Sequence, residues 1–334
     1  MFSKQTLMVG CCVLHLSFLG FGSGYSQTRL IQAIPTKSFG FLPLFVAQER
    51  GFYQGEGLEI LAPIMKMSPS VAALISGEVH FAAADSAMRA ALTGAPVKAL
   101  VFYYDRPTML FVGRPEIRSV RDLEGKNIAI LSYGSAVDFA TRQILRAHGL
   151  ADRDYTLVPM GPEPQRILGL ANGLVHASLL NPDGAAIAES QVEGLKLLAS
   201  FGDLQKVPFS GFAVSDRFRS GNPETVRKFL RATLKALMLT RDQPEVAALV
   251  AEKALGMDRK AALSAVRAIV GAISAKDPGG FSESGMRAWI TDNATTAGRK
   301  IDEVKISELA DLRLLREAQR GLGIHCEGGY ECGK

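Results

Sequence analysis

Four short polar segments of the sequence carry side chains that could bind a small polar ligand. Each segment lies between a short apolar run, expected to be a strand, and the start of an expected helix. Because free N–H groups and the positive end of the helix dipole gather at a helix N-terminus, such positions favour anionic groups. The candidate ligand-binding residues are Lys37, Ser38, Phe39 and Gly40; Asp85 and Ser86; Tyr133, Gly134 and Ser135; and Asn181 and Asp183.

The same residues also have purely structural interpretations. Helix N-capping accounts equally well for three of them, Ser86, Ser135 and Asn181. Lys37 could be a solvated lysine, and Phe39 could pack as a hydrophobic staple instead of offering its ring to a ligand. A binding role is favoured by convergence, because loops at the carboxyl ends of strands in open α/β sheets meet at one crevice.

The segment from Phe39 to Ile60 indicates how such a loop is positioned. Pro43 stands near the start of an apolar run and Gly51 follows its end, a pair that brackets a helix of about two turns. A strand is expected to begin at Leu58. The loop at 36–40 would therefore lie next to the N-terminus of this helix.

The sequence nearly repeats after about 96 to 98 residues, which predicts two similar units. Residues 30–33 correspond to 127–130, and residues 58–60 correspond to 156–158. In both copies short β-branched strands alternate with helices, the pattern of a mostly parallel sheet flanked by helices. We therefore expect an α/β protein with two lobes.

The expected lobes are joined by a hinge. Its crossings would lie near 110–115 and 205–213, and Asn222 and Pro223 would begin a long helix after the second crossing. The expected limits are residues 27–112 plus 213–320 for the first lobe, 115–204 for the second lobe and 321–334 for a tail.

Several segments resemble one family in the same order along the chain. They are PLFVAQERGFYQGEGLEI at 43–60, AALISGEVHF at 72–81, GAPVKALV at 94–101, SVRDLEGKNIAI at 119–130 and NPETVRKFLRA at 222–232. Residues 29–250 as a whole resemble the periplasmic substrate-binding proteins of the NMT1/THI5-like and SsuA-like group, which serve ABC importers.

The resemblance implies a type II periplasmic-binding-protein fold, in which two lobes close on a small molecule. The implied ligand is a sulfonate, a nitrate-like anion or a heteroaromatic such as a thiamine-pyrimidine precursor. The implied partner is an ABC permease in the inner membrane, and the receptor would be a monomer. Lys37 favours a negative charge on the ligand, whereas Phe39 and Tyr133 favour a flat or apolar part.

Composition agrees with a globular protein of two domains. The chain has 334 residues, of which 47% are hydrophobic and 21% are charged. The net charge of +5 is mild, the basic residues are scattered, and no nucleic-acid motif accompanies them. Nucleic-acid binding is therefore disfavoured.

The first 26 residues have the layout of a secretory signal peptide. Lys4 precedes an apolar stretch from Leu7 to Phe21, and small residues at 24 and 26 suit cleavage after Ser26. The alternative is a lipoprotein signal with Cys11 as the lipidated residue. No later segment has the roughly 18 consecutive apolar residues of a membrane span. The sequence thus predicts a periplasmic or secreted protein.

Enzyme activity is the weaker hypothesis. The motifs G-x-S-x-G, H-E-x-x-H, G-x-x-x-x-G-K-[ST] and G-x-G-x-x-G after a strand are all absent. The resembling group includes an enzyme that makes the thiamine pyrimidine, but its C-C-C-F-C motif has no counterpart here. We expect no cofactor and no bound metal. A ligand sensor that docks on a membrane receptor remains a third possibility.

Two histidines and two cysteines complete the candidates. His80 and His176 each follow a valine at an expected strand start, where a structural role competes with a pH-sensitive contact. Cys326 and Cys332 lie in a Gly-rich tail and could close a small disulfide loop in an oxidising compartment. A metal site is the alternative, but it would need more ligands than the tail supplies.

Overall fold

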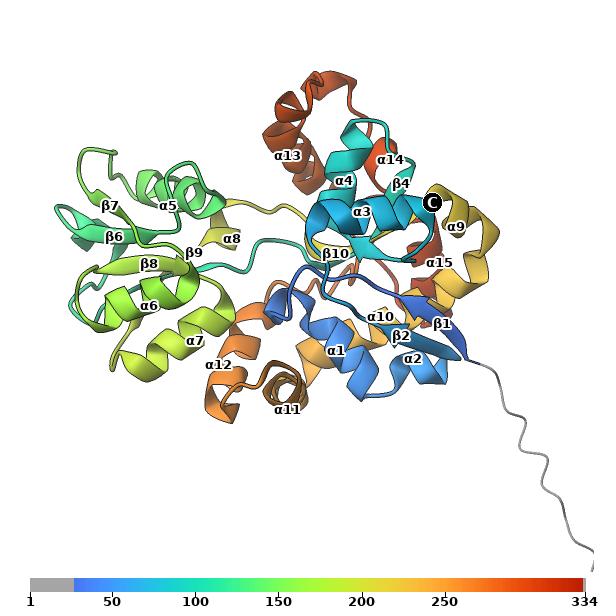
Figure 1. Cartoon of the computed structure of the whole chain (residues 1–334), viewed down its shortest axis with the longest axis horizontal. Helices are drawn as coiled ribbons and strands as arrows, with labels where there is room; N and C mark the ends of the chain where they lie inside the picture. Colours follow the sequence, from blue (N-terminus) through green and yellow to red (C-terminus); the bar gives the residue numbers. More distant parts are fainter. Residues whose placement is uncertain (1–26, 333–334) are drawn as a thin grey trace, which may run out of the picture.

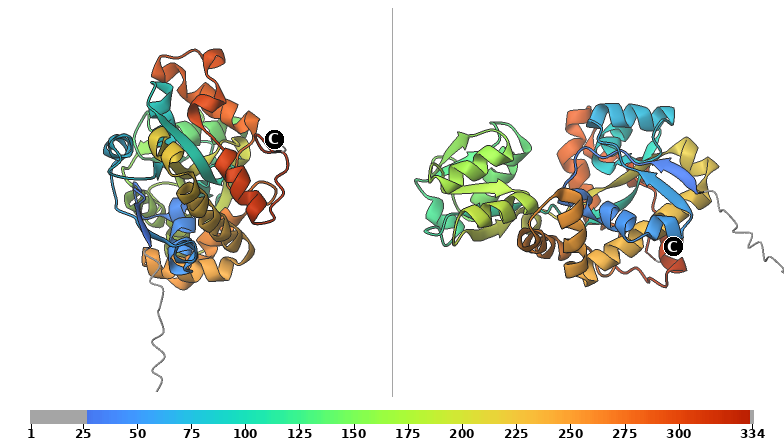
Figure 2. Two further views of the ribbon diagram at one scale, coloured as in Figure 1. Left: turned by 90° about the vertical axis from the view of Figure 1, so that its right-hand side faces the viewer. Right: turned by 60° about the horizontal axis from the view of Figure 1, so that its bottom comes forward.

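The computed structural model of the protein describes residues 27–332. Two lobes lie side by side, and each lobe has sheet strands flanked by helices (Figure 1). The right-hand view of Figure 2 shows the same division from another side. The predicted two-lobed α/β fold is confirmed.

The sheet of the first lobe has the strand order β2-β1-β3-β10-β4. β1 pairs in parallel with β2, and a parallel bridge between Gln32 and Phe81 joins this pair to the other three strands. β10 runs antiparallel to both of its neighbours. The strands are β1 (Thr28–Ile31), β2 (Leu58–Leu61), β3 (Ala82–Ala83), β4 (Val97–Tyr104) and β10 (Phe209–Ser215).

The sheet of the second lobe has the order β7-β6-β8-β5-β9. β6 runs parallel to β7 and β8, whereas β5 runs antiparallel to β8 and β9. The two sheets therefore share one plan, and the predicted internal repeat is confirmed. The strands are β5 (Leu110–Gly113), β6 (Asn127–Ile130), β7 (Thr156–Pro159), β8 (Ala177–Leu180) and β9 (Lys196–Ser200).

Helices flank the two sheets, and the chain after β10 is helical in all its regular elements. In the first lobe they are η1 (Phe39–Phe41), α1 (Leu42–Glu49), α2 (Phe52–Gly55), α3 (Met67–Ser76) and α4 (Ala84–Leu92). In the second lobe they are η2 (Val120–Leu123), α5 (Ala136–Ala147), α6 (Glu163–Ala171), α7 (Pro182–Gln191) and α8 (Phe201–Leu204). After β10 they are α9 (Asp216–Gly221), α10 (Pro223–Asp242), α11 (Pro244–Leu255), α12 (Arg259–Val270), α13 (Glu283–Asn293), η3 (Thr295–Ala297), η4 (Ile301–Glu303), α14 (Ile306–Leu309) and α15 (Arg313–Gly321).

The chain crosses between the sheets at 105–109 and 205–208. The first crossing lies before the expected 110–115, because β5 (110–113) already pairs with β8 and β9. The second crossing lies within the expected 205–213, but β10 enters the first sheet at Phe209, earlier than residue 213. Both differences involve antiparallel strands, whose partners are distant in sequence and leave no local signal.

Two predicted helices are confirmed. α1 has Pro43 in its first turn, and Gly51 just beyond its end has φ +68°, a conformation that favours glycine. α10 begins at Pro223 and runs for 20 residues, most of its apolar face buried in the first lobe. The Asn222 side chain makes no capping bond to α10; its amide nitrogen donates to the carbonyl oxygen of Phe218 at 3.3 Å.

His80 accepts a hydrogen bond from the backbone. Its Nδ1 atom lies 3.0 Å from the N–H of Ile31, and its ring meets the edge of Phe218 with centroids 4.9 Å apart. Only an unprotonated Nδ1 can accept this bond. Burial also lowers the pKa of His80 below its ordinary 6.5, so the structure supports the structural interpretation of this histidine.

Protonation of His80 is therefore expected to destabilise the fold in mild acid. The unfolded chain binds a proton near pH 6.5 and the folded chain only at lower pH, so stability should fall as pH drops below 6.5. His80→Asn keeps an acceptor that does not titrate, and it should show a shallower fall. Unfolding temperatures between about pH 5 and pH 8 measure the difference. Equal slopes in the two proteins would contradict the prediction.

The sequence makes specific predictions for both ends of the chain. Cys326 and Cys332 form a disulfide with Cα atoms 5.6 Å apart, which confirms the stapled tail; residues 326–332 are called the disulfide loop below. Within residues 27–332, none of the helices combines the length and apolar character that crossing a bilayer requires. The predicted signal peptide, its cleavage after Ser26 and the alternative lipidation of Cys11 lie outside the described residues.

Candidate functional site

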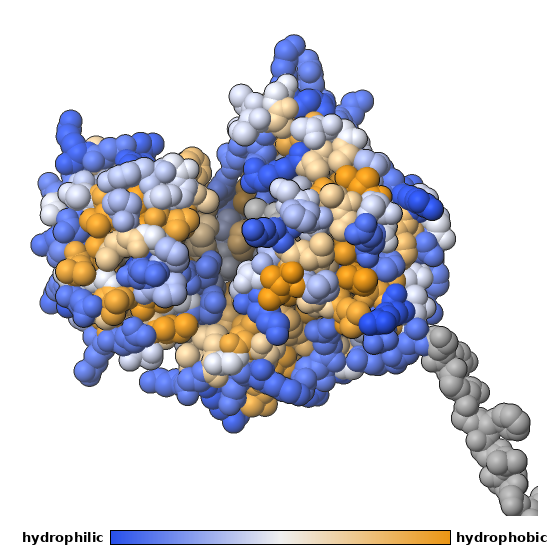
Figure 3. Space-filling model, in the orientation of Figure 1, coloured by the Kyte–Doolittle hydropathy of each residue, from blue (hydrophilic) through white to orange (hydrophobic). Residues whose placement is uncertain are grey.

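The antiparallel strand of each sheet fixes where the loops after the parallel strands lie. β10 begins just after the second crossing, and Phe209 pairs with Tyr104, the last residue of β4. β5 begins just after the first crossing, and Leu110 pairs with Leu180, the last residue of β8. The carboxyl ends of the parallel strands thus lie at the crossing end of both sheets. A groove separates the two lobes (Figure 3).

The loop after β1 lies close to the second crossing. A Cβ atom at Gly40 would be 3.1 Å from Oγ of Ser210. Lys37 is exposed and has no ion pair with any other described residue. The side chain of Ser38 makes no cap bond to η1. Phe39 is only 1% exposed, so its ring belongs to the core and cannot be the predicted ligand platform.

The two candidates at the start of α4 are engaged within the first lobe. Asp85 accepts hydrogen bonds from Nε1 of Trp289 and Nε of Arg89, both at 3.0 Å. Ser86 donates to the carbonyl oxygen of Ala83 at 3.1 Å and does not cap the helix. Both side chains therefore have partners within the first lobe, and these bonds fix the start of α4.

A shallow pocket beside this loop contains residues that the sequence did not single out. Its volume is about 400 Å³, and its lining residues are Ser68, Val71, Ser86, Arg89 and Ala90. The Arg89 guanidinium lies 5.8 Å from the ring centre of Trp289. Arg89 is also paired with Asp85 one turn earlier on α4, so its charge is already partly balanced.

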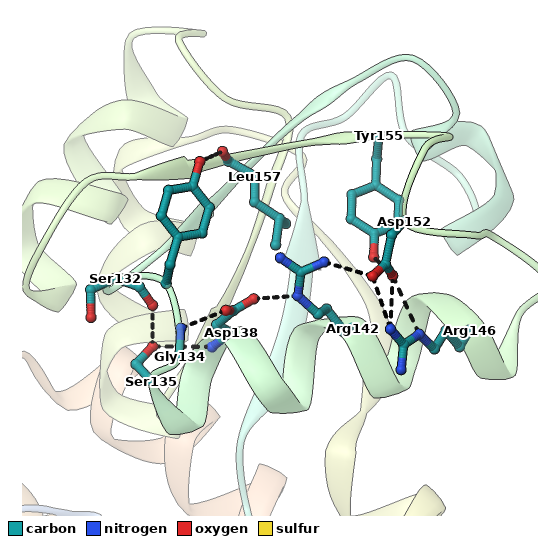
Figure 4. Close-up of polar contacts among 10 residues, drawn as sticks. Ser132, Gly134, Ser135, Asp138, Arg142, Arg146, Asp152, Tyr155 and Leu157 are labelled. Atoms are coloured by element: carbon teal, nitrogen blue, oxygen red, sulfur yellow. Dashed lines mark hydrogen bonds and ion pairs between the residues drawn. The ribbon is translucent and has the colours of Figure 1, made fainter.

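In the second lobe, Ser135 is a helix cap, as its structural interpretation predicted (Figure 4). Its Oγ accepts from the N–H of Asp138 at 3.2 Å and donates to Ser132 at 2.7 Å. Gly134 has φ +75°, and its N–H donates to Asp138 at 2.8 Å. Tyr133 donates to Leu157 at 2.9 Å, yet it remains 62% exposed, so its ring is available to a ligand.

The basic residues on α5 are already paired (Figure 4). Arg142 bridges Asp138 at 2.7 Å and Asp152 at 3.0 Å, and Arg146 also binds Asp152 at 2.9 Å. These arginines therefore supply little free positive charge on this side of the groove.

Two carboxylates lie at the start of α7: Asp183 belongs to α7, and Glu163 comes from the first turn of α6. Glu163 accepts the N–H of Asn181 at 2.8 Å, and the side chain of Asn181 makes no cap bond. Oδ1 of Asp183 is shielded from solvent and has no hydrogen-bond partner among the described residues. Burial raises the pKa of Asp183 and the pKa of Glu163 above their ordinary values.

The two sides of the groove therefore differ in charge. The first lobe contributes Lys37, which has no ion pair among the described residues, whereas Arg89 is already paired with Asp85. The second lobe contributes the carboxylates of Glu163 and Asp183. An acceptor without a donor costs free energy when it is buried, so Asp183 suits a ligand that donates a hydrogen bond. The candidate residues thus comprise an exposed cation, two carboxylates with raised pKa values and an exposed aromatic ring.

The two-lobed fold with a groove between its sheets is that of the periplasmic binding proteins. A solved example is the periplasmic aliphatic sulphonate binding protein SsuA from Escherichia coli. It has a TM-score of 0.58 and 18% identity, over 73% of this chain and 79% of that one.

Residues 38–247 match the NMT1/THI5 like family, and the chain belongs to this family. The riboflavin-binding protein RibY of Chloroflexus aurantiacus is 28% identical over 62% of this chain. The 4-amino-5-hydroxymethyl-2-methylpyrimidine phosphate synthase THI13 of Saccharomyces cerevisiae is 26% identical over 58% of this chain. The matches span 60% of RibY and 62% of THI13.

Proposed function

We propose that the protein is the solute-binding receptor of an ABC importer and binds a small heteroaromatic nutrient between its lobes. One observation carries this proposal: the carboxyl ends of the parallel strands in both sheets lie at the crossings, beside one groove. Contacts with both lobes would favour a closed state, which a membrane permease could recognise. The protein would act in the periplasm as a monomer.

The residues of the groove favour a heteroaromatic ligand over a simple inorganic anion. Nitrate has no hydrogen-bond donor, so it would leave Oδ1 of Asp183 without a partner. The negative charges of nitrate and of an ionised Asp183 would also repel each other. A ring with N–H or amino groups can donate to Asp183, stack on Tyr133 and turn a negative substituent toward Lys37. RibY, whose name gives riboflavin as its ligand, supports the same class.

An enzyme on the same fold is the second candidate, because the sequence identity to THI13 is 26% and that to RibY is 28%. In the described part of the chain, the two cysteines form a disulfide in the tail. The cysteine-rich motif of the thiamine-pyrimidine enzyme therefore has no equivalent in the groove. Product formation from a bound compound would favour the enzyme, whereas unchanged recovery would favour the receptor.

The proposal predicts that a heteroaromatic donor raises the unfolding temperature. The panel would contain riboflavin, aminopyrimidines, alkanesulfonates, taurine and nitrate. At a hundred times its Kd a ligand stabilises the native state by about 2.7 kcal/mol, enough to move the midpoint by several degrees. A dimethylamino analogue of the best aminopyrimidine serves as the matched control, because it cannot donate from that nitrogen.

The possible results separate the parts of the proposal. Stabilisation by the amino compound and not by its dimethylated analogue would support both the receptor and the ligand class. Stabilisation by sulfonates or nitrate alone would keep the receptor and overturn the heteroaromatic class. A folded protein that responds to none of the compounds would count against this receptor function.

A further inference from the structure

Both interlobe crossings line a small cavity that the C-terminal tail closes on one side. The cavity has a volume of about 210 Å³. Asp105 belongs to the first crossing and Lys206 to the second, and both lie in its wall. The rest of the wall comes from the segment 274–282 and from residues 327–329 of the disulfide loop. The tail and the hinge therefore share one surface.

The disulfide loop is fastened to the segment 274–282. The N–H of Glu327 donates to Lys276 at 3.0 Å, and the N–H of Tyr330 donates to Phe281 at 2.7 Å. The rings of Tyr330 and Phe281 stack with centroids 5.4 Å apart. The disulfide joins the two ends of this loop, and Arg316 also donates to the carbonyl oxygen of Tyr330 within it.

The neighbours of this segment in the chain contact both crossings. Directly before it, Ala272 accepts a hydrogen bond from the N–H of Asp105 at 2.8 Å. Directly after it, α13 lies so close to the second crossing that a Cβ atom at Gly285 would be 2.5 Å from the carbonyl oxygen of Lys206. A change in the segment 274–282 would therefore reach both strands of the hinge.

The disulfide is accessible to a reductant. Cys326 and Cys332 are both partly exposed, and a hollow of about 330 Å³ adjoins Cys326. The ionisable residues that line this hollow are Arg316, Arg320, His325 and Glu331. A carboxylate oxygen of Asp277, the ion-pair partner of Arg316, lies within 4.8 Å of both sulfurs, so the charges near the disulfide are of both signs. Access, and not local positive charge, is therefore what opens this disulfide to an attacking thiolate.

We propose that the disulfide loop is a redox-sensitive brace of the interlobe hinge. A dithiol reductant supplies two electrons and two protons, the S–S bond becomes the thiols of Cys326 and Cys332, and the dithiol closes to its own disulfide. The opened loop then releases the segment 274–282, and the crossings fluctuate more freely. The brace concerns the hinge, so it holds whatever the groove binds.

Hydrogen exchange of the full-length protein tests the brace. The protein carries the C11S/C12S substitutions, so Cys326 and Cys332 are its only cysteines. Dithiothreitol is expected to speed amide exchange by about tenfold or more in 274–282, 105–109 and 205–208, because these segments lose local protection. Exchange in α5 should stay unchanged, and reoxidation should restore the original rates. A C326S/C332S variant should show the faster rates without reductant and should not respond to it.

Several results would overturn the proposal. Faster exchange confined to 326–332 would show that the disulfide stabilises only its own loop and not the hinge. Faster exchange throughout α5 as well would indicate general unfolding instead of a loosened hinge. Unchanged rates after complete reduction, verified by thiol alkylation, would show that the brace does not depend on the disulfide. The reductant arm gives these answers even if the C326S/C332S variant fails to fold.

Discussion

Arg316→Met is expected to lower the free energy of unfolding by about 3–5 kcal/mol, the usual result of breaking a buried ion pair. Asp277 and Arg316 are 5% and 4% exposed, and the guanidinium contacts both carboxylate oxygens. Without the cation, Asp277 keeps a buried charge whose remaining side-chain donor is Gln319, at 2.9 Å. Urea unfolding of the wild-type and variant proteins measures the difference.

The matched control removes both charges. Asp277→Leu combined with Arg316→Met should recover most of the lost stability, because apolar replacement of a whole buried pair is often neutral. A loss below about 1 kcal/mol in the single variant would mean that the site takes up water or protonates, contrary to this prediction. Equal losses in the single and double variants would assign the effect to the missing contacts of Arg316 and not to an unpaired charge.

Local signals made most of the fold predictable. Pro43 and Gly51 bracket a helix through their own backbone preferences, and the repeat alone predicts the parallel strands of both lobes. The crossings could not be placed as well, because β5 pairs with strands that lie far later in the chain. An apolar run identifies a strand, but it does not identify the sheet that the strand joins.

The groove was predictable as a set of loops and less so as a set of side chains. The sequence selected the loops at 36–40 and 181–183, which lie at the crossing ends of the two sheets. It could not show that Phe39 points into the core, since burial depends on the whole packed lobe. Glu163 was missed because it reaches the loop at 181–183 from the start of α6, where it accepts the N–H of Asn181.

Asp183→Ala is expected to weaken binding of a heteroaromatic donor by roughly 5- to 150-fold, the factor that corresponds to about 1–3 kcal/mol for a buried polar group losing its partner. The probe is the aminopyrimidine or riboflavin that gives the largest thermal shift, and calorimetry measures Kd. Asp183→Asn keeps an acceptor oxygen and should lose less affinity for a neutral donor. A cationic ligand would discriminate more strongly between the carboxylate and the amide.

The affinity of the wild-type protein should also depend on pH. Burial raises the pKa of Asp183, and a donor prefers the ionised carboxylate, so affinity should fall as pH drops through this raised pKa. The Asp183→Asn protein should lose that part of the pH dependence. If both proteins follow one pH profile, Asp183 does not contact the ligand through its charge.

Gly184→Ala separates the roles of the two carboxylates. A Cβ atom at Gly184 would collide with the carboxyl group of Glu163, which is the mobile end of its side chain and can move aside. Glu163 would then leave the N–H of Asn181, whereas Asp183 would remain at the start of α7. If affinity is unchanged in Gly184→Ala and falls in Asp183→Ala, the ligand donates its hydrogen bond to Asp183. The opposite result would move that contact to Glu163 and leave Asp183 as a buried acid of the fold.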